Sequence, residues 1–110
     1  MFKIGDIVRC RTHKYGITAY KRPCEVVGIL SENKINVKCL GGDGSTFEVG
    51  ASLFELVPKY EVLHKGMCVK DKYGEEYKFI NYGVRGITVK HRLRDILGYD
   101  DIVYINKFIV

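Results

Sequence analysis

The sequence predicts an all-β protein built from two similar units, and three observations support this fold class. Most of the chain consists of short segments in which apolar, often β-branched, residues alternate with polar ones, a pattern typical of half-buried strands. Glycine, asparagine, aspartate or proline bounds these segments. The order of segments in the first half recurs in the second half, which indicates a duplicated unit.

The strands follow one another at short intervals. In chain order the predicted strands are DIVRCRTH (6–13), CEVVGIL (24–30), KINVKC (34–39), STFEV (45–49), MCVKDK (67–72), EYKFINY (76–82), GITVKH (86–91) and DIVYINKFIV (101–110). The glycine-rich segment 40–46 predicts a hairpin tip. Segment 51–56 is long enough only for a 3₁₀ turn, and segment 92–97, which Gly98 ends, predicts a short helical turn.

The two halves of the chain match position by position. The matched pairs are Gly5 with Gly66, Val8 with Val69, Arg9 with Lys70, Arg11 with Lys72, Tyr15-Gly16 with Tyr73-Gly74, INVK (35–38) with ITVK (87–90), and FELV (54–57) with KFIV (107–110). Pro58 falls between the copies, and because proline cannot donate to a strand ladder it marks the end of the first unit. We therefore predict two domains, residues 1–58 and 61–110, in contact through a short linker.

A unit of about 50 residues that begins with Gly-x-x-Val-Lys/Arg resembles the SH3-like small barrels. This group includes the KOW and Tudor modules of ribosomal, transcription-elongation, chromatin and small phage proteins. The resemblance rests on KIGDIVRCR (3–11) with Tyr15-Gly16, and on HKGMCVKDKYG (64–74). It implies two tandem SH3-like barrels of five strands each, packed through the linker. Short Lys- and Tyr-rich chains with such a start also resemble accessory proteins of bacterial phages and mobile elements.

Strand alternation predicts which side chains face outward, because successive residues of a strand point to opposite sides. The inward-facing residues are expected to be Val8, Cys10, Ile35, Met67, Val69 and Ile87, and the outward-facing residues Arg9, Arg11, His13, Lys70 and Lys72. Each unit thus has an apolar inner face and a cationic outer face.

Composition describes a soluble globular protein, with 46% hydrophobic and 28% charged residues. No apolar run approaches the ~18 residues of a membrane span, and the first residues lack the continuous apolar stretch of a signal peptide. Cys10, Cys24, Cys39 and Cys68 contain no Cys-x-x-Cys spacing, and a reducing compartment keeps such thiols free. We therefore expect a cytoplasmic protein with reduced, unreactive thiols and no membrane partner.

The net charge of +5 is concentrated at the start of the chain. Residues 1–22 contain six basic residues and one acidic residue, whereas the remaining 88 residues contain twelve of each. A local basic excess attracts polyanions through counterion release. The alternative is a solvated face that only keeps the protein in solution.

Catalytic and cofactor motifs are missing from the sequence. It contains no G-x-S-x-G, no H-E-x-x-H and no Cys-x₂₋₄-Cys spacing for zinc. The glycines of segment 40–46 lack the Gly-Lys-Ser/Thr ending of a phosphate-binding loop. We therefore expect no enzyme activity, no metal and no cofactor.

The feature of the sequence that indicates function is a predicted surface on which cationic and aromatic side chains lie together. Lysine and arginine neutralise phosphates, and tyrosine can stack on an unpaired base. The candidate binding residues are Arg9, Arg11, His13, Lys14, Tyr15, Tyr20, Lys21, Arg22, Lys70, Lys72, Arg92 and Arg94. They predict a binding protein whose partner is nucleic acid or a bacterial protein that handles nucleic acid. The alternative is a phage-encoded inhibitor of a host defence enzyme, an anti-CRISPR or similar protein, that acts by binding another protein.

Overall fold

The computed structural model describes residues 1–11 and 22–103. In the first half the strands are β1 (Ile7–Cys10), β2 (Cys24–Ile29), β3 (Lys34–Cys39), β4 (Thr46–Gly50) and β5 (Phe54–Leu56), and they form one antiparallel sheet in the order β4-β3-β2-β1-β5. In the second half β6 (Cys68–Lys70), β7 (Glu76–Tyr82), β8 (Gly86–Lys90) and β9 (Ile96–Gly98) form a second antiparallel sheet in that order. The prediction of an all-β protein is confirmed.

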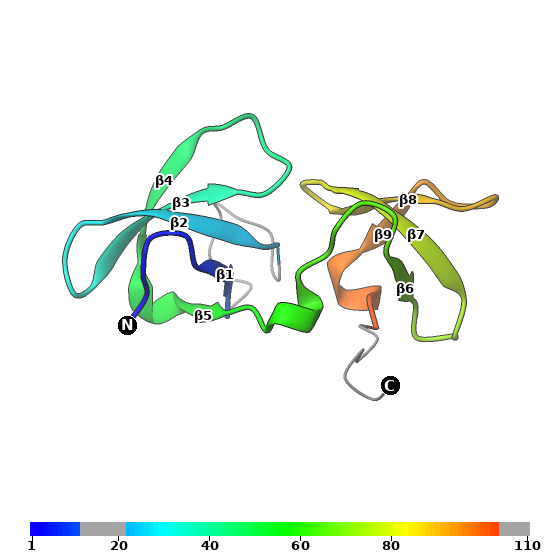
Figure 1. The fold of residues 1–110 in the computed structure, drawn as a ribbon, viewed down its shortest axis with the longest axis horizontal. Coiled ribbons are helices and arrows are strands. Elements are labelled where there is room, and N and C mark those ends of the chain that lie inside the picture. The colour runs from blue at the N-terminus through cyan, green and yellow to red at the C-terminus, as the bar shows by residue number, and fades with distance from the viewer. Residues whose placement is uncertain (12–21, 104–110) are drawn as a thin grey trace.

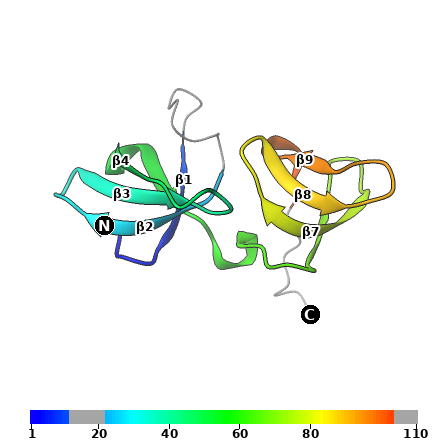
Figure 2. The same ribbon diagram turned by 90° about the horizontal axis from the view of Figure 1, so that it is seen from above.

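Three short 3₁₀ helices connect or follow the strands: η1 (Ala51–Leu53), η2 (Lys59–Glu61) and η3 (Tyr99–Asp101). The predicted 3₁₀ turn after β4 is therefore confirmed. The helical turn predicted over 92–97 is wrong, because this segment contains the bends between β8 and β9 and the start of β9. Figures 1 and 2 show the two sheets side by side, joined by the segment that contains η2.

The two sheets share details that alternation alone does not require. Gly5 and Gly66 both have a left-handed backbone, with φ of 95° and 94°. The Gly5 N–H donates to Val26 O at 2.8 Å, and the Gly66 N–H donates to Phe79 O at 2.9 Å. The register shifts directly after Val26 in one sheet and directly after Phe79 in the other. These equivalent bonds and bulges are what a duplicated unit would produce.

The strand after the last 3₁₀ turn also has a counterpart. In the first half β5 follows η1 and pairs with β1, with Arg9 opposite Glu55. In the second half Val103 follows η3 and forms an isolated antiparallel bridge with Lys70 of β6. Because Lys70 is matched with Arg9, the bridge makes Val103 the counterpart of Glu55, so the predicted match of segment 54–57 with 107–110 is wrong. Of the strand predicted over 101–110, Asp101 belongs to η3, and residues 104–110 lie outside the described residues.

Each half has its own apolar core. Val8, Val69, Ile35 and Ile87 are all buried, so their predicted inward orientation is confirmed. The first core consists of Val8, Cys10, Cys24, Val26, Ile35, Val37, Cys39, Val49 and Phe54. The second consists of Leu63, Val69, Tyr77, Phe79, Tyr82, Ile87, Val89, Leu97, Tyr99 and Ile102. Because the inward-facing residues form the two cores, the outer faces of both sheets are the candidate binding surfaces.

The turn between β3 and β4 is where the two halves touch. Leu40 is partly buried and packs against the second core. Gly41, with φ of 72°, lies so close to β7 that a Cβ atom there would be 2.2 Å from the Tyr82 carbonyl oxygen. The predicted hairpin tip is confirmed, and it also contacts the other half of the molecule.

Candidate functional site

Arg9 is engaged within the fold. Its Nε lies 3.0 Å from Glu55 Oε2, and its Nη1 lies 2.8 Å from Glu61 Oε1. Burial alone would lower the pKa of Arg9, but the hydrogen bonds to Glu61 and Glu55 outweigh it and raise that pKa. The expectation that Arg9 points freely away from the barrel is therefore wrong. Arg9 instead joins β1 to β5 and to the linker helix η2.

Arg22 is also predicted to lie at the surface, but it is buried in the structure. It is only 6% exposed, and its Nη2 reaches the Leu40 carbonyl oxygen at 3.4 Å. The prediction that Arg22 belongs to an exposed basic face is therefore wrong. Arg22 directly precedes Pro23 and β2, and its side chain lines a pocket where the two halves meet. Arg11 remains exposed, with Nη1 3.3 Å from the Ser52 carbonyl oxygen.

The other candidate residues of the first half fall in segment 12–21. They are His13, Lys14, Tyr15, Tyr20 and Lys21, and they lie outside the described residues. Of the first-half cations that the structure describes and the sequence selected, Arg11 alone presents an exposed charge.

In the second half, Asp71 organises the turn between β6 and β7. Its carboxylate accepts the N–H groups of Tyr73 and Glu75 at 2.9 and 3.0 Å, and the Tyr77 hydroxyl at 2.8 Å. Burial acts to raise the pKa of the Asp71 carboxyl, but these hydrogen bonds, led by that from Tyr77, hold the pKa below its ordinary value. Gly74, with φ of 83°, completes the turn. Tyr73 is consequently presented to solvent and is 81% exposed.

Cations surround Tyr73. The Lys72 ammonium lies 5.3 Å from the centre of its ring and 4.0 Å from Asp101 Oδ1. Arg94, from the turn between β8 and β9, lines with these residues a small pocket of about 130 Å³. The structure therefore brings together Lys72 and Arg94, which are 22 positions apart in the sequence, around an exposed ring. We call Lys72, Tyr73 and Arg94 the Tyr73 site.

Two other predicted cations lie near this turn. Lys70 is 3.8 Å from Glu76 Oε1, so its charge is partly compensated. Arg92 is exposed on the turn between β8 and β9. That turn is linked to the turn between β6 and β7 by the His91 Nε2 to Glu75 Oε1 contact of 2.8 Å.

A group of three lysines lies on the outer face of the second sheet. Lys78 of β7 is directly opposite Lys90 of β8. Lys65 lines a surface pocket of about 350 Å³ together with both of them. None of the three has a carboxylate within 4.0 Å among the described residues. We call these three residues the lysine cluster.

The outward orientation of two of these lysines could be predicted from the sequence, but their proximity could not. Alternation within segments 76–82 and 86–91 places Lys78 and Lys90 outward. Their proximity depends on the register of β7 on β8, including the bulge after Phe79, and a register is not readable from either strand alone.

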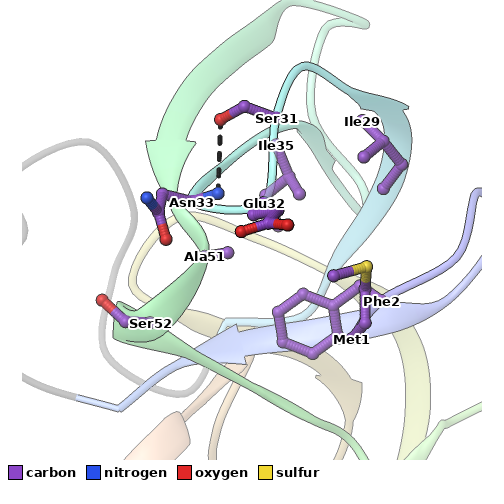
Figure 3. Close-up of a pocket in the computed structure, with 9 residues that line it drawn as sticks. All are labelled: Met1, Phe2, Ile29, Ser31, Glu32, Asn33, Ile35, Ala51 and Ser52. Carbon is purple, nitrogen blue, oxygen red and sulfur yellow. Dashed lines mark hydrogen bonds between the residues drawn. The ribbon is translucent and has the colours of Figure 1, made fainter.

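A further pocket, of about 330 Å³, opens at the end of the first sheet (Figure 3). Phe2, Ile29, Ile35 and Ala51 supply its apolar wall, and Glu32 is the charged side chain among its described lining residues. None of these lining residues is a lysine or an arginine, so this pocket does not fit the predicted anionic partner.

The described residues also show no metal centre, since no three His, Cys, Asp or Glu side chains among them are arranged to hold an ion. No helix in residues 1–11 and 22–103 has the length and apolar character needed to cross a membrane.

No protein-family model matches this sequence, and no curated protein matches it. A function for the chain therefore has to be inferred from the geometry and charge of its described residues.

Proposed function

We propose that this protein is a non-enzymatic, cytoplasmic nucleic-acid-binding protein whose two halves are SH3-like barrels in tandem. The strand order supports the barrel assignment, because in each half the segment after the last 3₁₀ turn returns to pair with the first strand, at β5 with β1 and at Val103 with Lys70. The lysine cluster is the observation that supports the ligand assignment.

The lysine cluster is unfavourable without a partner. Like charges directly opposite each other on neighbouring strands destabilise a sheet, and Lys78 and Lys90 form such a pair with no carboxylate of a described residue within 4.0 Å to offset it. A polyanion removes this repulsion and gains from the release of its own counterions. Lysine binds phosphate as a point charge without reading sequence, so we expect binding that is sensitive to salt and tolerant of sequence.

The test is the Lys78→Glu variant, measured against oligonucleotides across a salt series. We expect weaker binding for all sequences and a slope of log affinity against log salt that is smaller in magnitude by about 1. The same change places an acid opposite Lys90 and should raise the free energy of unfolding by about 0.2–1 kcal/mol. Fluorescence anisotropy and chemical denaturation measure the two effects.

Lys59→Glu is the matched control, because it changes the net charge equally at an exposed residue of the linker helix η2. Equal losses of affinity in Lys59→Glu and Lys78→Glu would show that net charge alone attracts the nucleic acid. A flat salt response with unaffected binding by Lys78→Glu would contradict the proposal.

The Tyr73 site predicts a preference for unpaired bases. Tyr73→Ala should lower affinity for single-stranded oligonucleotides roughly 5- to 150-fold, since stacking contributes about 1–3 kcal/mol per base. Duplex binding should change little. Folding should be unaffected because the side chain is largely in solvent. Tyr60→Ala in η2 is the control, and equal losses on single strands and duplexes would rule out stacking.

One observation favours a protein partner as a second candidate. Leu93 is 78% exposed on the turn between β8 and β9, between Arg92 and Arg94. An exposed apolar side chain flanked by arginines suits a protein interface, including that of a host defence enzyme inhibited by this protein. Capture of partners from a bacterial lysate with and without nuclease separates the two candidates, because a direct protein partner survives nuclease.

A further inference from the structure

Cys24 and Cys39 lie directly opposite each other on β2 and β3. The Leu40 N–H donates to the Pro23 carbonyl oxygen at 3.0 Å, so the cysteines occupy a non-hydrogen-bonded pair, the type in which facing side chains are closest. Their Sγ atoms are 3.3 Å apart. Such pairs have Cα atoms about 4.5 Å apart, which lies within the range of about 4.4–6.8 Å that disulfides span. The backbone therefore already holds the two thiols in position to be joined.

The two thiols differ in access. Cys39 lines a pocket of about 340 Å³ that Val84 of the β7–β8 turn also lines, so the pocket lies where the halves meet. Cys24 is fully buried and is not part of the pocket wall. A reagent that enters the pocket meets Cys39 first, with Cys24 directly behind it.

Arg22 lines the same pocket, and part of its guanidinium group is not engaged by the described residues. Among the described residues its buried Nε has no hydrogen-bond acceptor, and no carboxylate forms an ion pair with its guanidinium. Asp43 is also in the lining, but its carboxylate accepts the Ser45 N–H at 2.9 Å. A buried donor without a partner is costly, so the arginine suits an incoming anionic group.

We propose that Cys24 and Cys39 form a redox-active dithiol whose oxidant is a small disulfide that carries carboxylate groups. The Cys39 thiolate attacks one sulfur of the disulfide, forms a mixed disulfide and releases the other sulfur as a thiolate. Cys24 then attacks Cys39 Sγ, closes a disulfide between β2 and β3 and releases the second small thiol. The two electrons pass from the protein to the small disulfide, and the two thiol protons pass to the released thiols.

The electrostatics assign the same roles to the two cysteines. The hydrogen bond between the Cys24 and Cys39 thiols lowers the pKa of Cys39, burial opposes this change, and the Arg22 charge assists it. The same hydrogen bond, followed by burial, raises the pKa of Cys24. The thiolate form, which is the nucleophile, is thus favoured on the residue that faces the pocket.

This proposal is independent of nucleic-acid binding and is contrary to the expectation that all the buried thiols are inert. It is tested on the full chain with Cys68→Ser, which removes the exposed thiol. Oxidised glutathione supplies carboxylates, and cystamine, a cationic disulfide, is the comparison. After alkylation of the remaining thiols in denaturant, peptide mass spectrometry identifies the cysteines that were oxidised.

With oxidised glutathione we expect the Cys24 and Cys39 thiols to be lost together, with a mass decrease of about 2 Da for the two hydrogens removed, while Cys10 is not oxidised. Cystamine should react several-fold more slowly, and Arg22→Gln should remove that preference. Cys24→Ser should stop at a glutathione adduct on Cys39, and Cys39→Ser should leave Cys24 unmodified.

Three results would overturn the proposal: both thiols still free in the folded protein, a lasting adduct on Cys39 when Cys24 is present, or an unchanged preference in Arg22→Gln. Because the first two are read on a chain that retains Arg22, Cys24 and Cys39, they hold even if a variant fails to fold.

Discussion

Arg9→Ala is expected to lower the free energy of unfolding by about 3–5 kcal/mol, the usual cost of removing one partner of a buried ion pair. The Glu61 side chain is only 11% exposed and would lose its guanidinium partner at 2.8 Å. Glu55 is 44% exposed, so its contact with Arg9 contributes less. A loss of this size is comparable with the whole stability of a small protein. Denaturant unfolding followed by circular dichroism measures it.

Lys34→Ala provides the control for Arg9→Ala. Lys34 pairs with Glu48 at 3.2 Å, but both side chains are more than half exposed, and such pairs contribute about 0–1 kcal/mol. Adding Glu61→Gln to Arg9→Ala should recover part of the lost free energy of unfolding, because the buried carboxylate that Arg9 neutralised is then removed as well. If Arg9→Ala and Lys34→Ala destabilise equally, the pair between Arg9 and Glu61 is not the link between β1 and η2.

This result bears on how binding is tested. Because the sequence places Arg9 and Arg11 on an outward-facing basic surface, the direct sequence-based test is to reverse both charges and to expect lost polyanion binding with the fold intact. Because Arg9 is paired within the fold, its reversal would destabilise the protein and confuse the two effects. Lys78 avoids this difficulty, since it has no ion pair among the described residues.

Gly41→Ala is expected to destabilise the protein by about 3 kcal/mol. Its φ of 72° costs an L-residue about 1–2 kcal/mol. The new Cβ would also lie 2.2 Å from the Tyr82 carbonyl oxygen, so the β3–β4 turn would have to move away from β7. That movement withdraws Leu40 from the second core, and forcing atoms into a packed contact costs typically about 1–3 kcal/mol. Thermal and denaturant unfolding measure the total.

Gly44→Ala is the matched control, because Gly44 lies in the same turn with φ of 92° but would place its Cβ in open space. It should show only the backbone cost of about 1–2 kcal/mol. The difference between the two variants isolates the contact between the halves. Equal destabilisation by the two substitutions would mean that Gly41 does not hold the halves together.

The sequence by itself determined the local features of this protein. Strand alternation placed Val8, Ile35, Val69 and Ile87 in the cores because the direction of a side chain in a strand depends only on its position along that strand. The glycine-rich segment 40–46 became a hairpin tip because positive φ values are a local property of glycine. The predicted match of Gly5 with Gly66 agrees with their equivalent left-handed backbones and hydrogen bonds in the two sheets.

The tertiary structure decided which charges are free and which thiols meet. Arg9 pairs with Glu55 and Glu61, 46 and 52 positions away, so the basic excess counted over residues 1–22 overstated the cations available there. Lys78 and Lys90 became a cluster, and Cys24 and Cys39 became neighbours, only through strand register. Compensation of a charge and contact between two thiols are pairwise properties that depend on distance in space. The number of charges in a stretch of sequence therefore does not show which of them are paired in the folded protein.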